Sequence, residues 1–173
     1  MKDQPELLRF LADHGVAQVT HEHQAVFRVG EGEDIKAGIA GAHSKNLFLK
    51  DAKDQLWLIS AADLTVIDLK RLPLVIGSAR LSFGNAVLMQ EALGVTPGSV
   101  TALALVNDAA GRVRFVLDRV MWEAAAVNFH PLVNTATTTL TQADFRKFLA
   151  AVGVQPLVVD FQSMAVVEVA CVR

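Results

Sequence analysis

The sequence has little of what builds disulfide frameworks, metal clusters or membrane spans. It holds one cysteine, Cys171, in 173 residues, which excludes an internal disulfide and any multi-cysteine metal site. No apolar run approaches the roughly 20 residues that a membrane helix needs. Charged residues make up 20% of the chain and apolar residues 52%, which is too apolar for a disordered protein. We therefore expect one compact domain, residues 1–173, with a full core.

A signal peptide is not expected either, because residues 1–6 carry acids where such a peptide has a basic region and then an apolar stretch. We expect a cytoplasmic protein. The formal net charge of −2 argues against wrapping a long stretch of nucleic acid, since such affinity comes mainly from neutralised phosphates. The charge is uneven: residues 36–80 hold seven basic and four acidic residues, a net +3. This segment is a candidate anion site, although scattered lysines more often form an ordinary solvated surface.

Apolar periodicity and turn residues predict short strands between a few helices. Helices are expected from Pro5 to a stop at Gly15, as a short acidic helix and then a loop within 30–44, over 68–76 with a break at Pro73, from a cap at Asn85 to Leu93, and from Thr141 to Val152. Strands are expected at Ala17–His23, Asn46–Leu49, Gln55–Ile59, Arg80–Phe83, Thr101–Val106, Arg112–Leu117, Ala124–Phe129, Thr135–Leu140, Leu157–Val159 and Ala165–Val172. Because they do not alternate as βαβ units, we expect an α+β fold with a mixed, largely antiparallel sheet flanked by helices.

The last of these helices has clear start signals. Its first residues, Thr141-Gln142-Ala143-Asp144, resemble a capping box with Asp in place of Glu. An apolar stripe at helical spacing follows, from Phe145 to Val152. We therefore expect a helix here, followed by Gly153.

The common catalytic and cofactor motifs are missing. There is no GxSxG elbow, no phosphate-binding P-loop, no dinucleotide glycine fingerprint after a strand and no HExxH. His21 and His23 alternate on a predicted strand and could share a face, but no third metal ligand lies nearby, which favours surface histidines. Cys171 has no thiolate-activating neighbourhood and reads as a small apolar filler. We expect neither a metal nor a cofactor.

Three loops carry candidate chemistry. Lys45, where a Gly-rich loop enters a strand, can bind a phosphate as a point charge. The small-residue loop 94–101 can present successive backbone N–H groups to an anion or oxyanion. His130 stands at a strand end, followed by Pro131. Taken singly, each is more often ordinary turn chemistry, and their spacing identifies no reaction.

Four blocks together resemble a known family. In one order and spacing from about Pro5 to Phe161, the chain is similar to the bacterial prolyl-tRNA editing (YbaK/ProX) superfamily, and within it to freestanding deacylases of the ProXp-ala (PrdX) type. A pattern spread over separate blocks is far more specific than one motif. The blocks are Ser44–Asp51, Arg80–Phe83, Leu93–Thr101, and Asn128–Pro131 with Asn134–Thr137.

That resemblance implies a mixed α+β editing fold that hydrolyses Ala mischarged onto tRNA for proline. It implies that Lys45 holds a phosphate of the tRNA acceptor end, that Asn46 helps to fix the terminal adenosine and that His130 lines the aminoacyl pocket. Phe129 and Asn134, from the last block, are further expected substrate-binding residues.

The resemblance also places Gly98-Ser99-Val100-Thr101-Ala102 where the superfamily has a GxxxP loop, whose backbone holds the scissile carbonyl and the attacking water. We expect Gly98 and Ser99 to act in catalysis, and Val100 and Thr101 to bind substrate. Ala102 replaces the motif's proline, so we expect a more mobile loop with its backbone groups still in place.

An aminoacyl ester is already activated, so a positioned water and backbone N–H groups suffice for a useful rate. Help from a tRNA ribose hydroxyl ranks above His130 as the general base. Apolar side chains beside Lys45, the Gly98 loop and His130 are expected to form a sieve that admits alanine and excludes proline. The expected partners are the acceptor end of tRNA(Pro) carrying Ala and prolyl-tRNA synthetase, with no membrane and no DNA.

Three alternatives stay open. The YbaK-like branch removes Cys from the same tRNA, and the volume of a pocket cannot be read from a sequence, so Cys or Ser substrates remain. A non-catalytic tRNA-binding module would keep the fold with an inactive site, against which the presence of both Lys45 and His130 counts. The third is an α+β domain of unassigned function, which the four-block match disfavours.

Overall fold

A computed structural model describes residues 1–25 and 33–172, and nine strands in this part of the chain form one mixed sheet with helices on both faces. This confirms the expected fold class. In the same residues no helix has the length and apolarity to cross a membrane. The elements are α1 (Gln4–Asp13), β1 (Val19–Glu22), α2 (Glu33–Ala37), β2 (Ala42–Asp51), β3 (Leu56–Ala62), α3 (Leu72–Ile76), β4 (Leu81–Phe83), α4 (Ala86–Leu93), the 3₁₀ helix η1 (Ala102–Asn107), β5 (Val113–Asp118), α5 (Arg119–Glu123), β6 (Ala126–Phe129), β7 (Ala136–Thr141), α6 (Gln142–Ala151), β8 (Leu157–Asp160) and β9 (Ala165–Val166).

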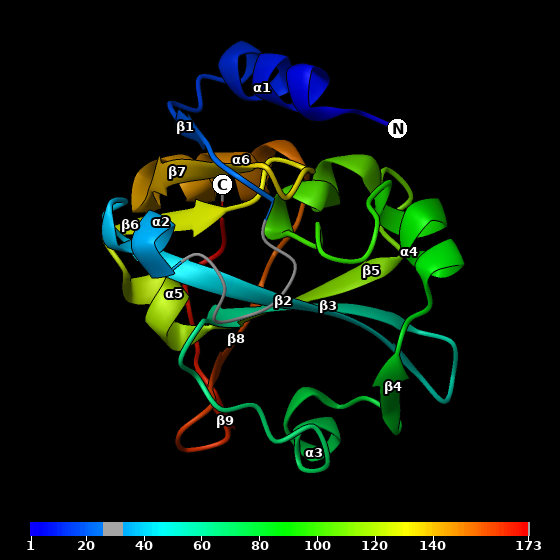
Figure 1. The fold of residues 1–173 in the computed structure, drawn as a ribbon. Helices are drawn as coiled ribbons and strands as arrows, with labels where there is room; N and C mark the ends of the chain where they lie inside the picture. Colours follow the sequence, from blue (N-terminus) through cyan, green and yellow to red (C-terminus); the bar gives the residue numbers. More distant parts are fainter. Residues whose placement is uncertain (26–32, 173) are drawn as a thin grey trace.

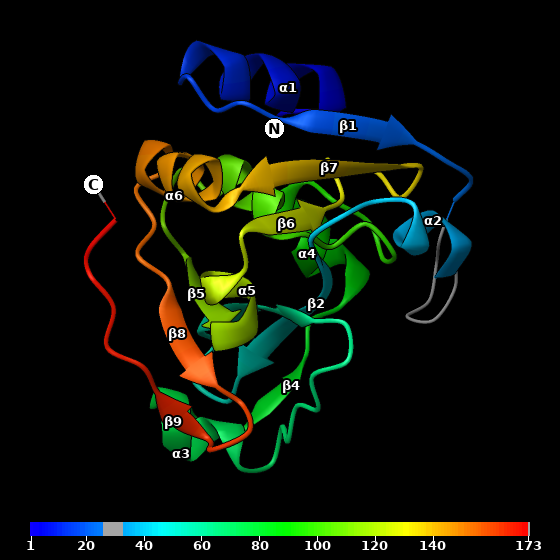
Figure 2. The ribbon, with the colours of Figure 1, turned by 90° about the vertical axis from the view of Figure 1, so that its left-hand side faces the viewer.

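The strand order is β1-β7-β6-β2-β3-β5-β8-β9, and β4 pairs with β2 beside this path. The pairs β2–β6, β3–β5 and β5–β8 are parallel, and the five other pairs in the described residues are antiparallel. The sheet is therefore mixed and largely antiparallel, as predicted. Figure 2 shows β1, β7 and β6 side by side at the top of the molecule, above β2, β5 and β8.

Strand β2 joins the two halves of this sheet. Its first residues, Ala42 and His43, pair in parallel with β6. From Ser44 onward it pairs with β3, and its last residues also pair with β4. The resemblance block that holds Lys45 and Asn46 therefore begins where β2 leaves β6, at the centre of the fold.

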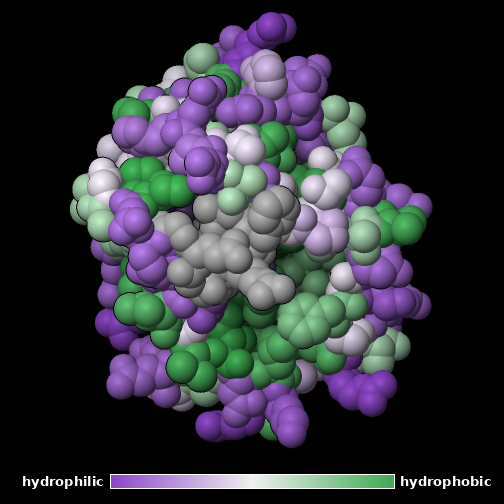
Figure 3. All heavy atoms as spheres, viewed as in Figure 1, coloured by the Kyte–Doolittle hydropathy of each residue, from purple (hydrophilic) through white to green (hydrophobic). Residues whose placement is uncertain are grey.

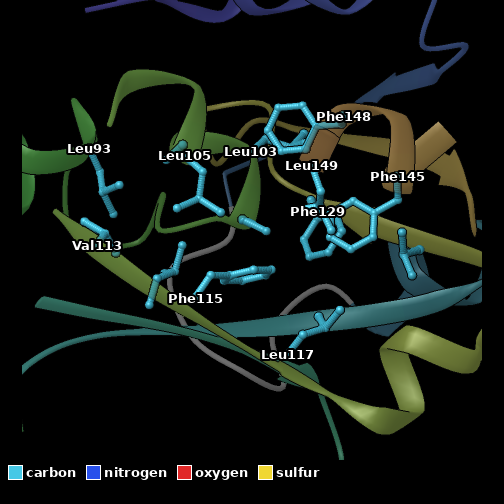
Figure 4. Close-up of a cluster of buried hydrophobic side chains, with 14 of the residues drawn as sticks. Leu93, Leu103, Leu105, Val113, Phe115, Leu117, Phe129, Phe145, Phe148 and Leu149 are labelled. Atoms are coloured by element: carbon cyan, nitrogen blue, oxygen red, sulfur yellow. The ribbon is translucent and has the colours of Figure 1, made fainter. Parts of the chain in front are cut away.

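Two apolar clusters sandwich the central strands. Figure 1 shows α4 and α6 on one side of β2, β3 and β5, and α3 on the other. Burying each large apolar side chain contributes about 1.5–3 kcal/mol. The larger cluster, drawn in Figure 4, includes Leu93, Leu103, Leu105, Val113, Phe115, Leu117, Phe129, Phe145, Phe148 and Leu149. The smaller cluster includes Leu49, Trp57, Ile59, Ala61, Leu72, Ile76, Val116, Val159 and Phe161.

The predicted helix caps are mostly present. Asn85 caps α4 by accepting from Leu88 N, and Gly94 ends the helix with a left-handed φ of +66°. Thr141 caps α6 by accepting from Asp144 N. The capping box is incomplete, however, because the Asp144 carboxylate accepts from the Thr141 hydroxyl at 2.6 Å and from Ala17 N at 3.2 Å. The shorter Asp side chain therefore ties α6 to the chain that precedes β1.

Several predicted elements were wrong. Thr101–Val106 is not a strand, because Thr101 accepts from Leu103 N and thereby starts η1, in which Ala102 to Leu105 are all buried. A short apolar run that is buried all round has no period that separates strand from helix. Pro73 does not break a helix: it lies in the first turn of α3, where a missing N–H costs nothing.

Other boundaries also differ. The sequence prediction missed α5, a single turn that Asp118 caps by accepting from Val120 N. Only Ala165–Val166 of the last predicted strand pairs in the sheet. Residues 42–44, predicted as loop, already belong to β2. The first part of the predicted acidic helix, residues 30–32, lies outside the described residues.

Candidate functional site

The two faces of β2 have different surroundings, because side chains alternate along a strand. Phe48 packs in the larger cluster and Leu49 in the smaller one. By the same alternation Asn46 shares the face of Phe48, and Lys45 shares the face of Leu49. Lys45 and Asn46, which the resemblance assigns to one site, therefore project from opposite faces of the strand.

The ammonium group of Lys45 is held by backbone carbonyls. Its Nζ donates to Asp63 O at 3.1 Å and to Thr65 O, both in the segment that follows β3. The neighbouring carboxylate of Asp63 pairs with Lys36 of α2 at 2.9 Å. Among the described residues no carboxylate lies within ion-pairing distance of Lys45. The ammonium is thus positioned while its charge remains available to an anion.

His130 follows the end of β6 and is half-buried. Its Nδ1 lies 2.9 Å from Ala136 O. Because a carbonyl oxygen only accepts, Nδ1 carries the proton and Nε2 keeps a free lone pair. Burial lowers the pKa of His130 below 6.5, the hydrogen bond to Ala136 opposes this shift, and the charges of His23 and Lys36 lower the pKa further. The ring is therefore neutral at pH 7.

His23 lies beside His130, with the ring centroids 6.3 Å apart. Its Nδ1 lies 2.7 Å from Gln24 O, and its Nε2 lies 2.8 Å from the Thr137 hydroxyl oxygen. Both ring nitrogens are engaged, and His21 is exposed on β1. The described residues contain no group of three His, Cys, Asp or Glu side chains placed to hold a metal ion.

The Lys45 and His130 side chains belong to one polar face of the sheet. His43 pairs in parallel with Asn128. Lys45 lies two residues after His43 on β2, and His130 lies two residues after Asn128, just beyond the end of β6. Lys36 connects them, because it pairs with Asp63 beside Lys45 and its charge acts on His130. Figure 2 shows α2, which carries Lys36, near the end of β6 and the start of β7.

Asn46 takes part in a chain of neutral hydrogen bonds on the other face of β2. The Ser60 hydroxyl donates to Asn46 Oδ1 at 2.5 Å, and Asn46 Nδ2 donates to Ser44 Oγ at 3.2 Å. The Ser44 hydroxyl in turn donates to Asn128 O at 2.9 Å. Ser60 is fully buried, with 0% of its surface exposed, and it pairs directly with Asn46 across β2 and β3.

The Gly98 loop packs on the same face as Asn46. Val100 contacts the larger cluster, and Gly98 has a φ of +90°, which favours glycine. The backbone N–H of Ser99 donates to Thr96 O at 3.0 Å and is therefore occupied. No backbone acceptor among the described residues binds the N–H of Gly98 or Val100. Ala102, in the place of the family's proline, is buried as the first residue of η1.

Two further expected residues lie in different surroundings. Phe129 is 1% exposed and packs in the core against Phe145, with the rings tilted and the centroids 5.0 Å apart. Asn134 is half-buried in the turn between β6 and β7. In that turn Leu132 is buried with a left-handed φ of +68°, a costly conformation that its packing must hold. The His130 turn is therefore fixed by core contacts.

The structure adds four residues to the site: Lys36, Asp63, Thr65 and Ser60. Asp63 and Thr65 act through backbone carbonyls, which leave no mark in a sequence. The pairing of Lys36 with Asp63 required the path of the chain after β3. Ser60 had a usable signal, since it is a hydroxyl residue directly after the apolar run Leu56–Ile59 of the predicted strand.

The side of the sheet that carries Lys45 also has exposed apolar side chains. Leu64 and Val66 follow β3, and Leu74 and Phe83 belong to α3 and β4. Figure 3 shows apolar surface in the lower half of the molecule, where Figure 1 places these elements. An open pocket of about 570 Å³, lined by Thr65 and Asp118 among others, lies at the carboxyl ends of β3, β5 and β8.

Comparisons with known proteins agree with this fold. The family profile of the aminoacyl-tRNA editing domain matches residues 30–148. Prolyl-tRNA synthetase associated domain-containing protein 1 of Xenopus laevis is 40% identical over 161 residues, 90% of this chain and 95% of that protein. The prolyl-tRNA editing protein ProX of Acetoanaerobium sticklandii is 37% identical over 133 residues, 76% of this chain and 81% of that protein.

A solved structure shows the same fold. A protein described as a candidate trans-editing enzyme for prolyl-tRNA synthetase superposes with a TM-score of 0.68 at 18% identity, over 98% of this chain and 99% of that one. The family profile covers most of the chain, and the Xenopus relative aligns along nearly all of it. The chain belongs to the aminoacyl-tRNA editing domain family and is related to prolyl-tRNA trans-editing proteins.

Proposed function

We propose that the chain, residues 1–173, is a trans-editing deacylase that hydrolyses alanine from mischarged Ala-tRNA(Pro). The observation that carries this proposal is the polar face on which a positioned, unneutralised Lys45 shares surroundings with a neutral, partly buried His130. A cation and a neutral acceptor nitrogen suit a substrate that has both phosphates and an ester. Membership of the editing family supplies the reaction class.

Lys45 binds a phosphate of the acceptor end in this proposal. Two carbonyls hold the ammonium before RNA arrives, so little side-chain entropy remains to be lost on binding. An ammonium with three donors keeps at least one for a phosphate oxygen. A contact limited to the acceptor end neutralises few phosphates, which fits a net charge of −2 and implies a shallow salt dependence.

The ester bond breaks when a water attacks the carbonyl carbon and the terminal ribose oxygen leaves. Free backbone N–H groups of Gly98 and Val100 stabilise the oxyanion, whereas that of Ser99 is already occupied by Thr96 O. A tRNA ribose hydroxyl helps to move the proton, and His130 Nε2 accepts a hydrogen bond within the aminoacyl pocket. The Gly98 loop and Lys45 lie on opposite faces of β2. In this proposal the substrate therefore contacts both faces of the strand.

Selectivity in this proposal comes from size. A synthetase pocket made for proline cannot sterically exclude the smaller alanine, and a few methylenes are worth only about 1–3 kcal/mol. A second site that admits alanine and is too small for proline sorts the two. The names of relatives connect this fold to prolyl-tRNA synthetase, which makes tRNA(Pro) and that synthetase the proposed partners.

The decisive experiment compares four substrates. tRNA(Pro) is charged in turn with Ala, Cys, Ser and Pro, and the loss of each amino acid is followed with and without the protein. We expect rapid loss of Ala and survival of Pro. Equal loss of Ala and Pro would contradict the size-selection proposal. If Cys or Ser were lost faster than Ala, that amino acid would be the substrate in place of alanine. If none of the four amino acids were lost, the chain would be a non-catalytic tRNA-binding module.

A further inference from the structure

The hydrogen bonds around Asn46 have a fixed direction. At the far end of the chain, Asn128 O is a backbone carbonyl and can only accept, so the Ser44 hydroxyl must donate to it. The remaining lone pairs of Ser44 Oγ then accept from the amide nitrogen of Asn46. A flipped amide would place Oδ1 against the Ser44 oxygen with no hydrogen between them. Only one orientation of the amide therefore satisfies Ser44.

The other side of the amide meets Ser60. In the favoured orientation Oδ1 of Asn46 faces the buried Ser60 hydroxyl, which donates to it. One of the two Nδ2 hydrogens is bound to Ser44, and the second has no acceptor among the described residues. Asn46 is half-buried, so part of the residue remains accessible to solvent. The network thus presents a hydrogen-bond donor and keeps the amide oxygen on the protein side.

From this geometry we propose that Ser60 is a positioning residue for Asn46. By holding Oδ1 it directs the free N–H of Asn46 toward an acceptor atom of the tRNA terminal nucleotide, either a ring nitrogen or a ribose oxygen. Ser60 itself is fully buried and touches no substrate. This inference rests on the proposed function, because it concerns how the deacylase grips its substrate.

A double-mutant cycle tests this role. The variants Ser60→Ala, Asn46→Ala and the double variant are assayed for kcat and KM on Ala-tRNA(Pro), and their thermal unfolding is recorded. A neutral hydrogen bond is worth about 0.5–1.5 kcal/mol, so Ser60→Ala is expected to lower kcat/KM about three- to tenfold, mainly by raising KM. In the Asn46→Ala background the same change is expected to have no further effect on kcat/KM.

Thr138→Val is the matched control. Thr138 is as fully buried as Ser60, and its hydroxyl bonds to Thr20 and not to Asn46. It is expected to change unfolding temperature without changing KM. Ser60→Ala with unchanged KM would overturn the inference, as would an equal loss of activity in the presence and absence of Asn46. A wild-type protein that deacylates none of the four charged tRNAs would instead remove the proposed function, with the fold unaffected.

Discussion

Strand β2 separates two kinds of polar chemistry between its faces. On one face Lys45, His130 and their neighbours include charged and titratable groups. On the other face Asn46 is held by hydroxyls and a carbonyl, with no charge in the chain of hydrogen bonds. The first face lies beside exposed apolar side chains, and the second rests on the larger core cluster.

This separation has a physical reason. An ionic group is costly to bury unless it is paired and hydrogen-bonded. Lys45 therefore lies on the face where backbone carbonyls of the segment after β3 accept from its ammonium group. A neutral amide is satisfied by hydroxyls and tolerates a position next to the core. The lesson is that one short motif, Lys45-Asn46, delivers a cation and a neutral donor to different environments because consecutive residues of a strand point opposite ways.

The largest expected effect concerns Phe129, the last residue of β6, and His130, which follows it. Phe129 belongs to the core and His130 to the polar face, so Phe129→Ala should act on stability alone. We expect a loss of about 3–5 kcal/mol in the free energy of unfolding, because a buried aromatic ring leaves a cavity. Chemical denaturation measures it. If Phe129→Leu, which keeps most of the volume, changed the preference for Ala over Pro, the division between the two faces would be incorrect.

Removing the cation should have the next largest effect. Lys45→Ala is expected to lower kcat/KM on Ala-tRNA(Pro) about 10- to 100-fold, since hydrogen bonds to charged groups are worth about 1.5–3 kcal/mol. The slope of log affinity against log salt should also fall by about one unit. Filter binding and deacylation rates at several salt concentrations measure both.

Lys45→Arg provides a control for charge. An Arg keeps the positive charge but cannot occupy the same pair of carbonyls with a compact ammonium. In Lys45→Arg the slope of log affinity against log salt should return to its wild-type value, whereas the deacylation rate should recover only in part. An unchanged rate in Lys45→Ala would remove Lys45 from the site.

Much of this fold could be predicted from the sequence. Caps at Asn85 and Thr141 and the apolar stripe of α6 are local signals, and they located both helices. Two of the failures share one cause. In Ala102–Leu105 and in α5, tertiary burial decides the conformation, and a window of a few residues does not contain that information.

The candidate site was predicted less completely. Lys45, Asn46 and His130 could be named because the resemblance carries side chains from one sequence to another. Their partners are carbonyls of Asp63 and Thr65 and the hydroxyl of Ser60, which approach only after β3 has paired with β2. A backbone oxygen has no residue type, so no motif can identify it. The side on which each predicted residue projects also required the strand register.

A smaller effect is expected from His130. His130→Gln keeps a polar side chain and should lower kcat/KM about tenfold if the ring only binds within the pocket. General-base catalysis typically contributes about 10²–10⁴-fold, so a loss above a hundredfold would make His130 the base and displace the tRNA hydroxyl. Rates measured between pH 5 and 8 add a second criterion. The wild-type rate should persist below pH 6.5, because the pKa of His130 is lowered.

The lowered pKa of His130 also affects stability. Between its folded pKa and 6.5 the unfolded chain binds more protons at this residue than the native state does. The free energy of unfolding contributed by His130 is therefore fully present above pH 6.5 and falls as the pH drops through this window. Urea denaturation at several pH values should show a steeper decline for the wild type than for His130→Gln. Parallel declines would mean that the ring is solvated in the native state.

The smallest expected effect comes from Lys36, which connects the two groups of the polar face. Its ion pair with Asp63 is partly exposed, so Lys36→Gln should cost less than about 1 kcal/mol of stability. Burial and the charge of His23 are larger causes of the lowered pKa of His130, and the charge of Lys36 adds to them. Removing that charge should therefore raise the pKa slightly. The acid limb of the pH–rate profile should move to higher pH, and NMR titration of His130 should report the same shift.

Arg119→Gln, which breaks ion pairs with Glu123 of α5 and Asp160 of β8, should leave that limb in place. Were both variants to move it equally, the effect would reflect overall charge, and Lys36 would no longer join Lys45 and His130 into one site.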